Sequence, residues 1–85
     1  MPEISRFYGI IIFINYNDHS PPHFHARYGD FYCIFYINDE IIEGKMPARA
    51  VKMIKKWNIL HKEELIKNWE LAQMHEPMVL IMPLQ

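Results

Sequence analysis

Histidines are concentrated in one short segment of the chain. Residues 18–28 read DHSPPHFHARY, and three of the protein's five histidines lie there, close behind Asp18. Neutral imidazoles and carboxylates are the groups that bind zinc and related divalent metals. His23 and His25 are two positions apart, so a strand would point both at one ion, with Asp18 or His19 as a third ligand. The set Asp18, His19, His23 and His25 therefore predicts a divalent metal site, for zinc or a similar ion. Three protein ligands and an open position for water would suit a metal-dependent hydrolase.

The same segment also permits chemistry without a metal. His23, His25 and Arg27 form the candidate catalytic set of a ribonuclease. One imidazole would take the proton of a 2′-hydroxyl, the other would protonate the leaving oxygen, and Arg27 would stabilise the charged phosphorane. A third interpretation is structural or partner-binding: the histidines pack against prolines and aromatic rings, and Asp18 caps a turn. The sequence leaves all three interpretations open.

The alternation of residues 23–28, HFHARY, sets the expected geometry of these side chains. Successive side chains of a strand point to opposite faces. We expect the apolar alternate residues to face the core, namely Phe24, Ala26 and Tyr28. We expect the other three to lie outside in one exposed row, namely His23, His25 and Arg27.

The segments around this strand predict a β-meander. Residues 7–16 and 31–37 are rich in β-branched and aromatic residues, which favour strands, and turn residues follow each of them. A short fourth strand is expected at residues 40–43, after an Asn-Asp turn. We therefore expect an antiparallel meander of three or four strands.

The second half of the chain predicts two helices. Pro47 suits the first turn of a helix, and apolar residues then recur at helical spacing as far as Ala72. We expect a break near residues 58–61, where Asn58 is a weak helix former and acidic residues follow in a new first turn. Residues 78–84 are expected to form a last strand or a docking tail. The fold class is thus α+β: the meander is followed by two helices packed on one face, in a single domain of residues 1–85.

Two of the expected strands are apolar on both faces, and this raises the question of what covers the second face. A strand with one wet face alternates apolar with polar residues, whereas FYGIIIFINY and FYCIFYI do not. Helices on one side would leave the other side bare. We therefore expect a homodimer, or a small partner protein, to cover it.

Composition restricts the class of protein. The formal net charge is −1, and 51% of the residues are hydrophobic. The chain is therefore neither strongly basic nor disordered in character. A single cysteine excludes an internal disulfide and suits a reducing compartment. No segment has the length of apolar sequence that a membrane span needs, and the start lacks a signal peptide's pattern. We expect a cytoplasmic protein without membrane contact.

Cations are aligned on one side of the first expected helix. Lys45, Arg49, Lys52 and Lys56 follow one another at helical spacing, and no acidic residue lies between the first and the last. This basic row could bind an acidic partner protein or the phosphates of RNA. A solvated outer face is the alternative interpretation.

Four segments together resemble a known family: MPEISRFYGIIIF, DHSPPHFHARYG, EGKMPARA and HKEELIKNWELA. They are similar to the small bacterial proteins of the family called domain of unknown function 4160. The resemblance implies an association with toxin–antitoxin-type operons, and no chemistry. On this basis we expect a protein-interaction component of a toxin–antitoxin-like module. The alternative is an enzyme at the histidine row, either a metal-dependent hydrolase or a metal-free ribonuclease.

Overall fold

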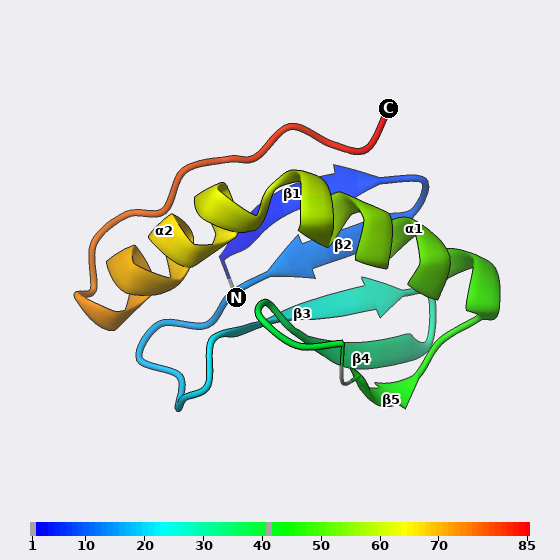
Figure 1. Cartoon of the computed structure of the whole chain (residues 1–85), viewed down its shortest axis with the longest axis horizontal. Helices are drawn as coiled ribbons and strands as arrows, with labels where there is room; N and C mark the ends of the chain where they lie inside the picture. Colours follow the sequence, from blue (N-terminus) through cyan, green and yellow to red (C-terminus); the bar gives the residue numbers. More distant parts are fainter. Residues whose placement is uncertain (1, 41) are drawn as a thin grey trace.

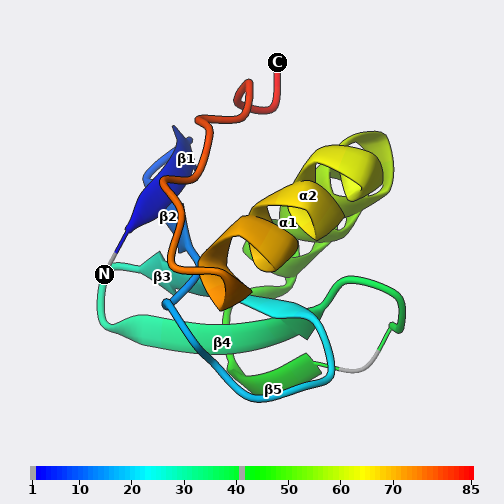
Figure 2. The ribbon, with the colours of Figure 1, turned by 90° about the vertical axis from the view of Figure 1, so that its left-hand side faces the viewer.

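The fold is a five-stranded antiparallel sheet with two helices on one of its faces. The computed structural model describes residues 2–40 and 42–85. The strands are β1 (Glu3–Phe7), β2 (Ile10–Phe13), β3 (His23–Tyr28), β4 (Phe31–Tyr36) and β5 (Ile42–Lys45), and the helices are α1 (Ala48–Leu60) and α2 (Lys62–Gln73). Each strand pairs with the next in the chain, so the order is β1-β2-β3-β4-β5 (Figure 1). Figure 2 shows both helices lying against the same side of the twisted sheet. The expected α+β class is confirmed.

The sheet has five strands, one more than the upper end of the expected three or four. The apolar segment 7–16, expected to be one strand, contains a turn at Tyr8 and Gly9, where both residues have positive φ angles of 50° and 81°. Two successive residues with positive φ form the type of turn that joins antiparallel strands tightly. Asn-Gly is the usual sequence signal for such a turn. Here Tyr8 stands where asparagine is usual, so the sequence lacks the signal that would have predicted this turn.

The register of β3 places its alternate residues on opposite faces, as the sequence predicted. Phe13 of β2 and Ile34 of β4 flank His25, and Phe24 lies opposite Phe35. Phe24 is fully buried beneath the helices, as is Ala26, and Tyr28 packs at the border of the same core.

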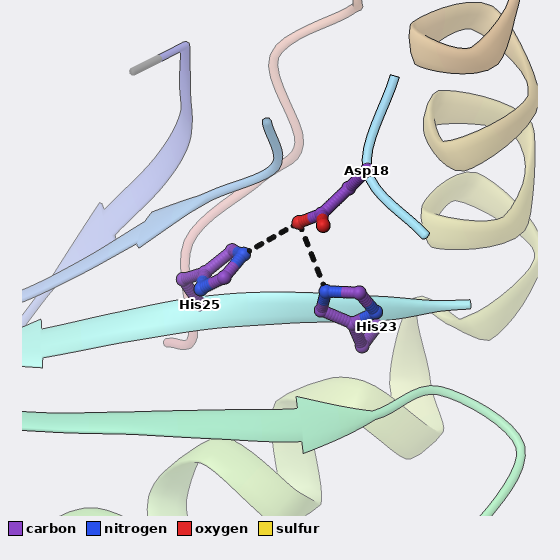
Figure 3. Close-up of side chains that lie close together, drawn as sticks. All are labelled: Asp18, His23 and His25. Carbon is purple, nitrogen blue, oxygen red and sulfur yellow. Dashed lines mark hydrogen bonds and ion pairs between the residues drawn. The ribbon is translucent and has the colours of Figure 1, made fainter. Parts of the chain in front are cut away.

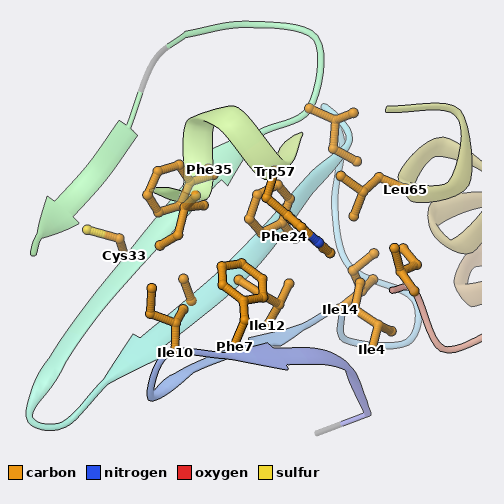
Figure 4. Packing of buried hydrophobic residues seen from close by; sticks show 14 of the residues in the cluster. Ile4, Phe7, Ile10, Ile12, Ile14, Phe24, Cys33, Phe35, Trp57 and Leu65 are labelled. Atoms are coloured by element: carbon orange, nitrogen blue, oxygen red, sulfur yellow. The ribbon is translucent and has the colours of Figure 1, made fainter. Parts of the chain in front are cut away.

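The main core lies between the sheet and the helices. Trp57 of α1 is 0% exposed, and its ring lies 5.3 Å from that of Phe7 and 5.7 Å from that of Phe24, measured between ring centroids. Figure 4 shows these rings packed next to the isoleucines of β1 and β2. Cys33 of β4 is buried in the same core, and burial raises the pKa of its thiol. The thiol therefore acts as a small apolar group.

The break between the two helices falls where it was expected. α1 ends at Leu60 and α2 begins at Lys62, with His61 between them. The backbone carbonyl of His61 accepts a hydrogen bond from Leu65, and the His61 imidazole lies 2.6 Å from the Glu64 carboxylate. Two acidic residues in the first turn of α2 favour the start of a helix there.

The segment after α2 is an extended docking tail, one of the two expected alternatives. Residues 77–85 run between β1 and the helices (Figure 2). The backbone N–H of Ile81 donates to Ile4 of β1, and the buried amide of Asn68 forms two hydrogen bonds with the backbone of Val79. The indole of Trp57 donates to the carbonyl of Met82. Side chains of both helices therefore hold the tail against the sheet.

Neither described helix has the length and apolar character required to cross a lipid bilayer.

Candidate metal centre

A loop brings Asp18 against β3. The chain between β2 and β3 turns back toward the end of α2, where the backbone N–H of Asn17 donates to Ala72 and the side chain of Gln73 donates to the carbonyl of Asp18. The backbone N–H of His19 also donates to the Asp18 carboxylate. These contacts fix the position of the carboxylate beside His23 and His25 (Figure 3).

Three possible ligand atoms converge in this cluster. One carboxylate oxygen of Asp18, Oδ2, lies 3.0 Å from Nε2 of His23 and 3.0 Å from Nε2 of His25. All three atoms lie within 4.8 Å of one another. Metal–ligand bonds of about 2.0–2.2 Å in tetrahedral geometry place neighbouring ligand atoms roughly 3.3 Å apart. Each distance from Oδ2 to an imidazole Nε2 is therefore close to the separation of two ligand atoms on one ion.

The outer nitrogens of both imidazoles have oxygen partners. Nδ1 of His23 lies 2.7 Å from the carbonyl oxygen of Pro21, and Nδ1 of His25 lies 2.5 Å from the hydroxyl of Tyr32. A carbonyl oxygen only accepts hydrogen bonds, so Nδ1 of His23 carries the hydrogen. In a neutral His23 the lone pair on Nε2 then faces the carboxylate. A second proton or a metal ion is needed between these two acceptors.

The family comparison covers this cluster. The family model described as Domain of unknown function (DUF4160) matches residues 9–70 of the chain. The chain belongs to this family. The match includes the whole cluster, the basic row and most of α2, so these features lie within the DUF4160 domain. No curated protein and no solved structure matches the chain significantly.

The expected exposure of the histidine row is wrong. In this DUF4160 domain His23 is only 3% exposed and His25 only 5%. The ring of Phe13 stacks on His25 at 4.9 Å, and Trp69 of α2 lies 5.0 Å from the ring of His23. Alternation along a strand determines the face on which a side chain lies, but it does not show what covers that face. Here the loop and neighbouring rings cover it.

Asp18 is in the form that binds metals. Burial alone would raise the pKa of its carboxyl group. Hydrogen bonds from His25 and the backbone of His19, together with the interaction with His23, outweigh burial, so the pKa is lowered. The carboxylate is thus ionised at neutral pH, as metal coordination requires.

Arg27 and His19 lie apart from the convergent atoms. The Arg27 guanidinium is exposed and lies over the ring of Tyr32, 5.9 Å from its centroid, and that ring in turn stacks on His25. The Tyr32 ring thus contacts both the Arg27 guanidinium and the His25 imidazole. The His19 side chain is 92% exposed and approaches the other carboxylate oxygen of Asp18, Oδ1, at 3.2 Å.

The basic row is exposed along β5 and α1. None of Lys45, Arg49, Lys52 and Lys56 forms an ion pair in the part of the chain that the structure describes. The four cations therefore face solvent without internal charge compensation.

Two neighbours of the cluster were not anticipated from the sequence. The Tyr32 hydroxyl reaches His25 from β4, and burial, followed by the negative charge of Asp18, raises its pKa. The side-chain amide of Asn15, just after β2, lies 3.3 Å from Nε2 of His25. The register between strands determines both contacts, and no local pattern reveals that register.

Proposed function

We propose that this protein binds one divalent transition-metal ion, of the zinc class, through Asp18, His23 and His25. The convergence of Oδ2 of Asp18 and Nε2 of both histidines carries the proposal. Two imidazoles and one carboxylate suit zinc and its first-row neighbours.

The surroundings of the three ligands support the same conclusion. Histidines that bind metals usually donate their other ring N–H to an oxygen, which fixes the tautomer and the ring orientation. The Pro21 carbonyl serves His23 in this way, and the Tyr32 hydroxyl is placed to serve His25. An ion between Nε2 of His23 and the carboxylate also removes the repulsion between two facing acceptors.

Metal-dependent hydrolysis is the enzymatic activity that such an ion would support if water occupies its fourth position. A zinc-class ion with three protein ligands acidifies a water molecule in its remaining position. A metal-free ribonuclease has less support in the geometry. Nε2 of both histidines is directed at Asp18, and the Arg27 guanidinium lies over the ring of Tyr32.

Elemental analysis of the protein, purified without chelator or affinity tag, tests the proposal. We expect close to one equivalent of zinc or a related ion, and loss of that ion in Asp18→Asn and His25→Ala. Asp30→Asn is the matched control, because Asp30 is an exposed aspartate in the turn between β3 and β4. A wild-type chain that takes up no divalent ion, even when titrated with zinc, would contradict the proposal.

A role in partner binding is the second candidate, and the uncompensated basic row favours it. An acidic surface on a partner protein would supply the missing negative charge. The exposed ring of Tyr32, on the face of the sheet that carries His25, adds a second surface for a partner or another copy of the chain. Together with the family resemblance, these surfaces suit an interaction component of a toxin–antitoxin-like module.

Two measurements test the second candidate. Light scattering after size exclusion should give the mass of a dimer if another copy covers the sheet. Co-expression with the product of a neighbouring gene should give a stable complex that Lys52→Glu and Lys56→Glu weaken, while Lys67→Glu on α2 leaves it intact. A monomer that binds no neighbouring protein but shifts RNA in a gel would refute partner binding and favour RNA as the ligand of the row.

A further inference from the structure

Asn15 is the polar side chain that approaches the cluster from the end of β2. Its amide nitrogen lies 3.3 Å from Nε2 of His25, the same nitrogen that faces Asp18 at 3.0 Å. The amide can turn by half a revolution about its last torsion, which exchanges Nδ2 and Oδ1 and leaves the other atoms in place. Either end of the amide can therefore face the imidazole.

The hydrogen-bonding groups of the cluster favour the amide oxygen of Asn15 at the position facing Nε2 of His25. For Nε2 of His25 to face the Asp18 carboxylate, the nitrogen must carry a proton or bind a cation. In both cases the lone pair of Nε2 is already used, so an amide NH₂, which only donates, finds no acceptor there. The carbonyl oxygen of Asn15 is the end that this position attracts.

We propose that Oδ1 of Asn15 is the fourth ligand and completes a closed tetrahedral site together with Asp18, His23 and His25. This inference rests on the proposed metal binding. The amide of Asn15 and Nε2 of His25 are already separated by the distance that tetrahedral coordination gives two neighbouring ligand atoms. His19, the other residue near the carboxylate, points into solvent and remains outside the coordination.

A closed site gives the ion a structural role. Structural zinc sites take four protein ligands, whereas catalytic sites keep one position for water. The nearly complete burial of His23 and His25 fits the closed type. The ion would join the end of β2, the loop and β3, and the contacts of the loop with Ala72 and Gln73 would extend this clamp to α2.

Titration of the full-length chain with Co²⁺, followed by visible absorption, tests the fourth ligand. The wild type should show the intense bands of four-coordinate Co²⁺, and azide should not change them, because no exchangeable position is left. Asn15→Ala should bind one equivalent at least tenfold more weakly, since loss of even an outer-sphere partner costs roughly 10–100-fold. Its spectrum should respond to azide. Asn38→Ala, in the exposed turn between β4 and β5, should behave as the wild type.

Asn15→Asp tests whether the affinity for Co²⁺ rises or falls, and this test holds even if Asn15→Ala folds poorly. Aspartate keeps the oxygen, adds a charge and loses the NH₂ group. Tighter Co²⁺ binding than in the wild type is expected if the oxygen is a ligand. Weaker binding would overturn the inference, because it would mean that Asn15 contributes its N–H.

The possible failures can be told apart. If the wild type binds Co²⁺ tightly but its spectrum responds to azide, the fourth ligand is water. The metal-binding function then stands and the closed site fails. If the wild type binds neither Co²⁺ nor Zn²⁺, both proposals fail.

Discussion

Both faces of β3 are nearly sealed from water over residues 23–26, but by different means. Phe24 and Ala26 are covered by helices and belong to a continuous apolar core. His23 and His25 are covered by a loop, and their polar atoms are matched within a small network around Asp18. The stability of the helix-covered face depends on how well apolar side chains fill its volume. The stability of the loop-covered face depends on charge and hydrogen bonding. Equal burial therefore implies different sensitivities to mutation, pH and ions.

The largest effect is expected from removing volume on the helix-covered face. Trp57 is fully buried between Phe7 and Phe24. Trp57→Ala should therefore lower the free energy of unfolding by about 3–5 kcal/mol. Urea denaturation measures the change. Ile59 on the same helix is 75% exposed, so Ile59→Ala is the control and should change the free energy of unfolding by about 0.5 kcal/mol at most. Similar losses for both variants would contradict a core centred on Trp57.

The loop-covered face should respond to metal instead. At a free zinc concentration about 100 times the dissociation constant, the free energy of unfolding should rise by about 2.7 kcal/mol, because the ion binds only the folded chain. A chelator should remove this gain. Thermal melts with and without zinc measure it, and His25→Ala should show no gain. Equal stabilisation of His25→Ala would place the ion elsewhere.

Removing the charge of Asp18 without changing its shape should have a smaller effect. In chelator, Asp18→Asn should lower the free energy of unfolding by about 2 kcal/mol at neutral pH, since the imidazoles lose their acceptor. Folding lowers the pKa of Asp18, so its contribution is complete above the ordinary value of 3.8 and disappears as pH falls through the folded pKa. Urea titrations from neutral pH into the acid range should show the two proteins converging in acid. A constant difference would mean that the carboxylate charge is not responsible.

The smallest effect is expected from the basic row, whose side chains are exposed along β5 and α1. Lys52 and Lys56 are exposed and form no ion pair among the described residues. Lys52→Glu and Lys56→Glu should therefore each change the free energy of unfolding by about 0.5 kcal/mol at most. Zinc should stabilise both variants as it does the wild type. A large fall in the free energy of unfolding of either variant would show that the basic row stabilises the fold.

Local patterns in the sequence predicted a large part of this molecule. The alternation in HFHARY determined which β3 residues face the helices, and Asn58 with the acidic residues after it marked the helix break. The sequence also predicted that Asp18 or His19 would join His23 and His25, and in the structure Asp18 is the residue that faces both imidazoles.

Long-range contacts explain what the sequence did not reveal. The loop is held over the histidines by Ala72 and Gln73, residues far along the chain on α2. No periodicity in residues 14–22 encodes these contacts, so the histidines were expected to be exposed. Cross-strand register likewise determines the approach of Tyr32 and Asn15 to His25. The fifth strand was missed because no residue pattern predicted the left-handed turn at Tyr8.

The position of Trp69 gives the protein an internal optical probe. Its indole lies 5.0 Å from the ring of His23, whereas the other tryptophan, Trp57, is hydrogen-bonded to the tail. Emission from Trp69 should therefore be quenched when a paramagnetic ion arrives beside His23. Replacing one tryptophan at a time with phenylalanine would separate the two signals, so that ion arrival and tail detachment can be followed independently without an added dye.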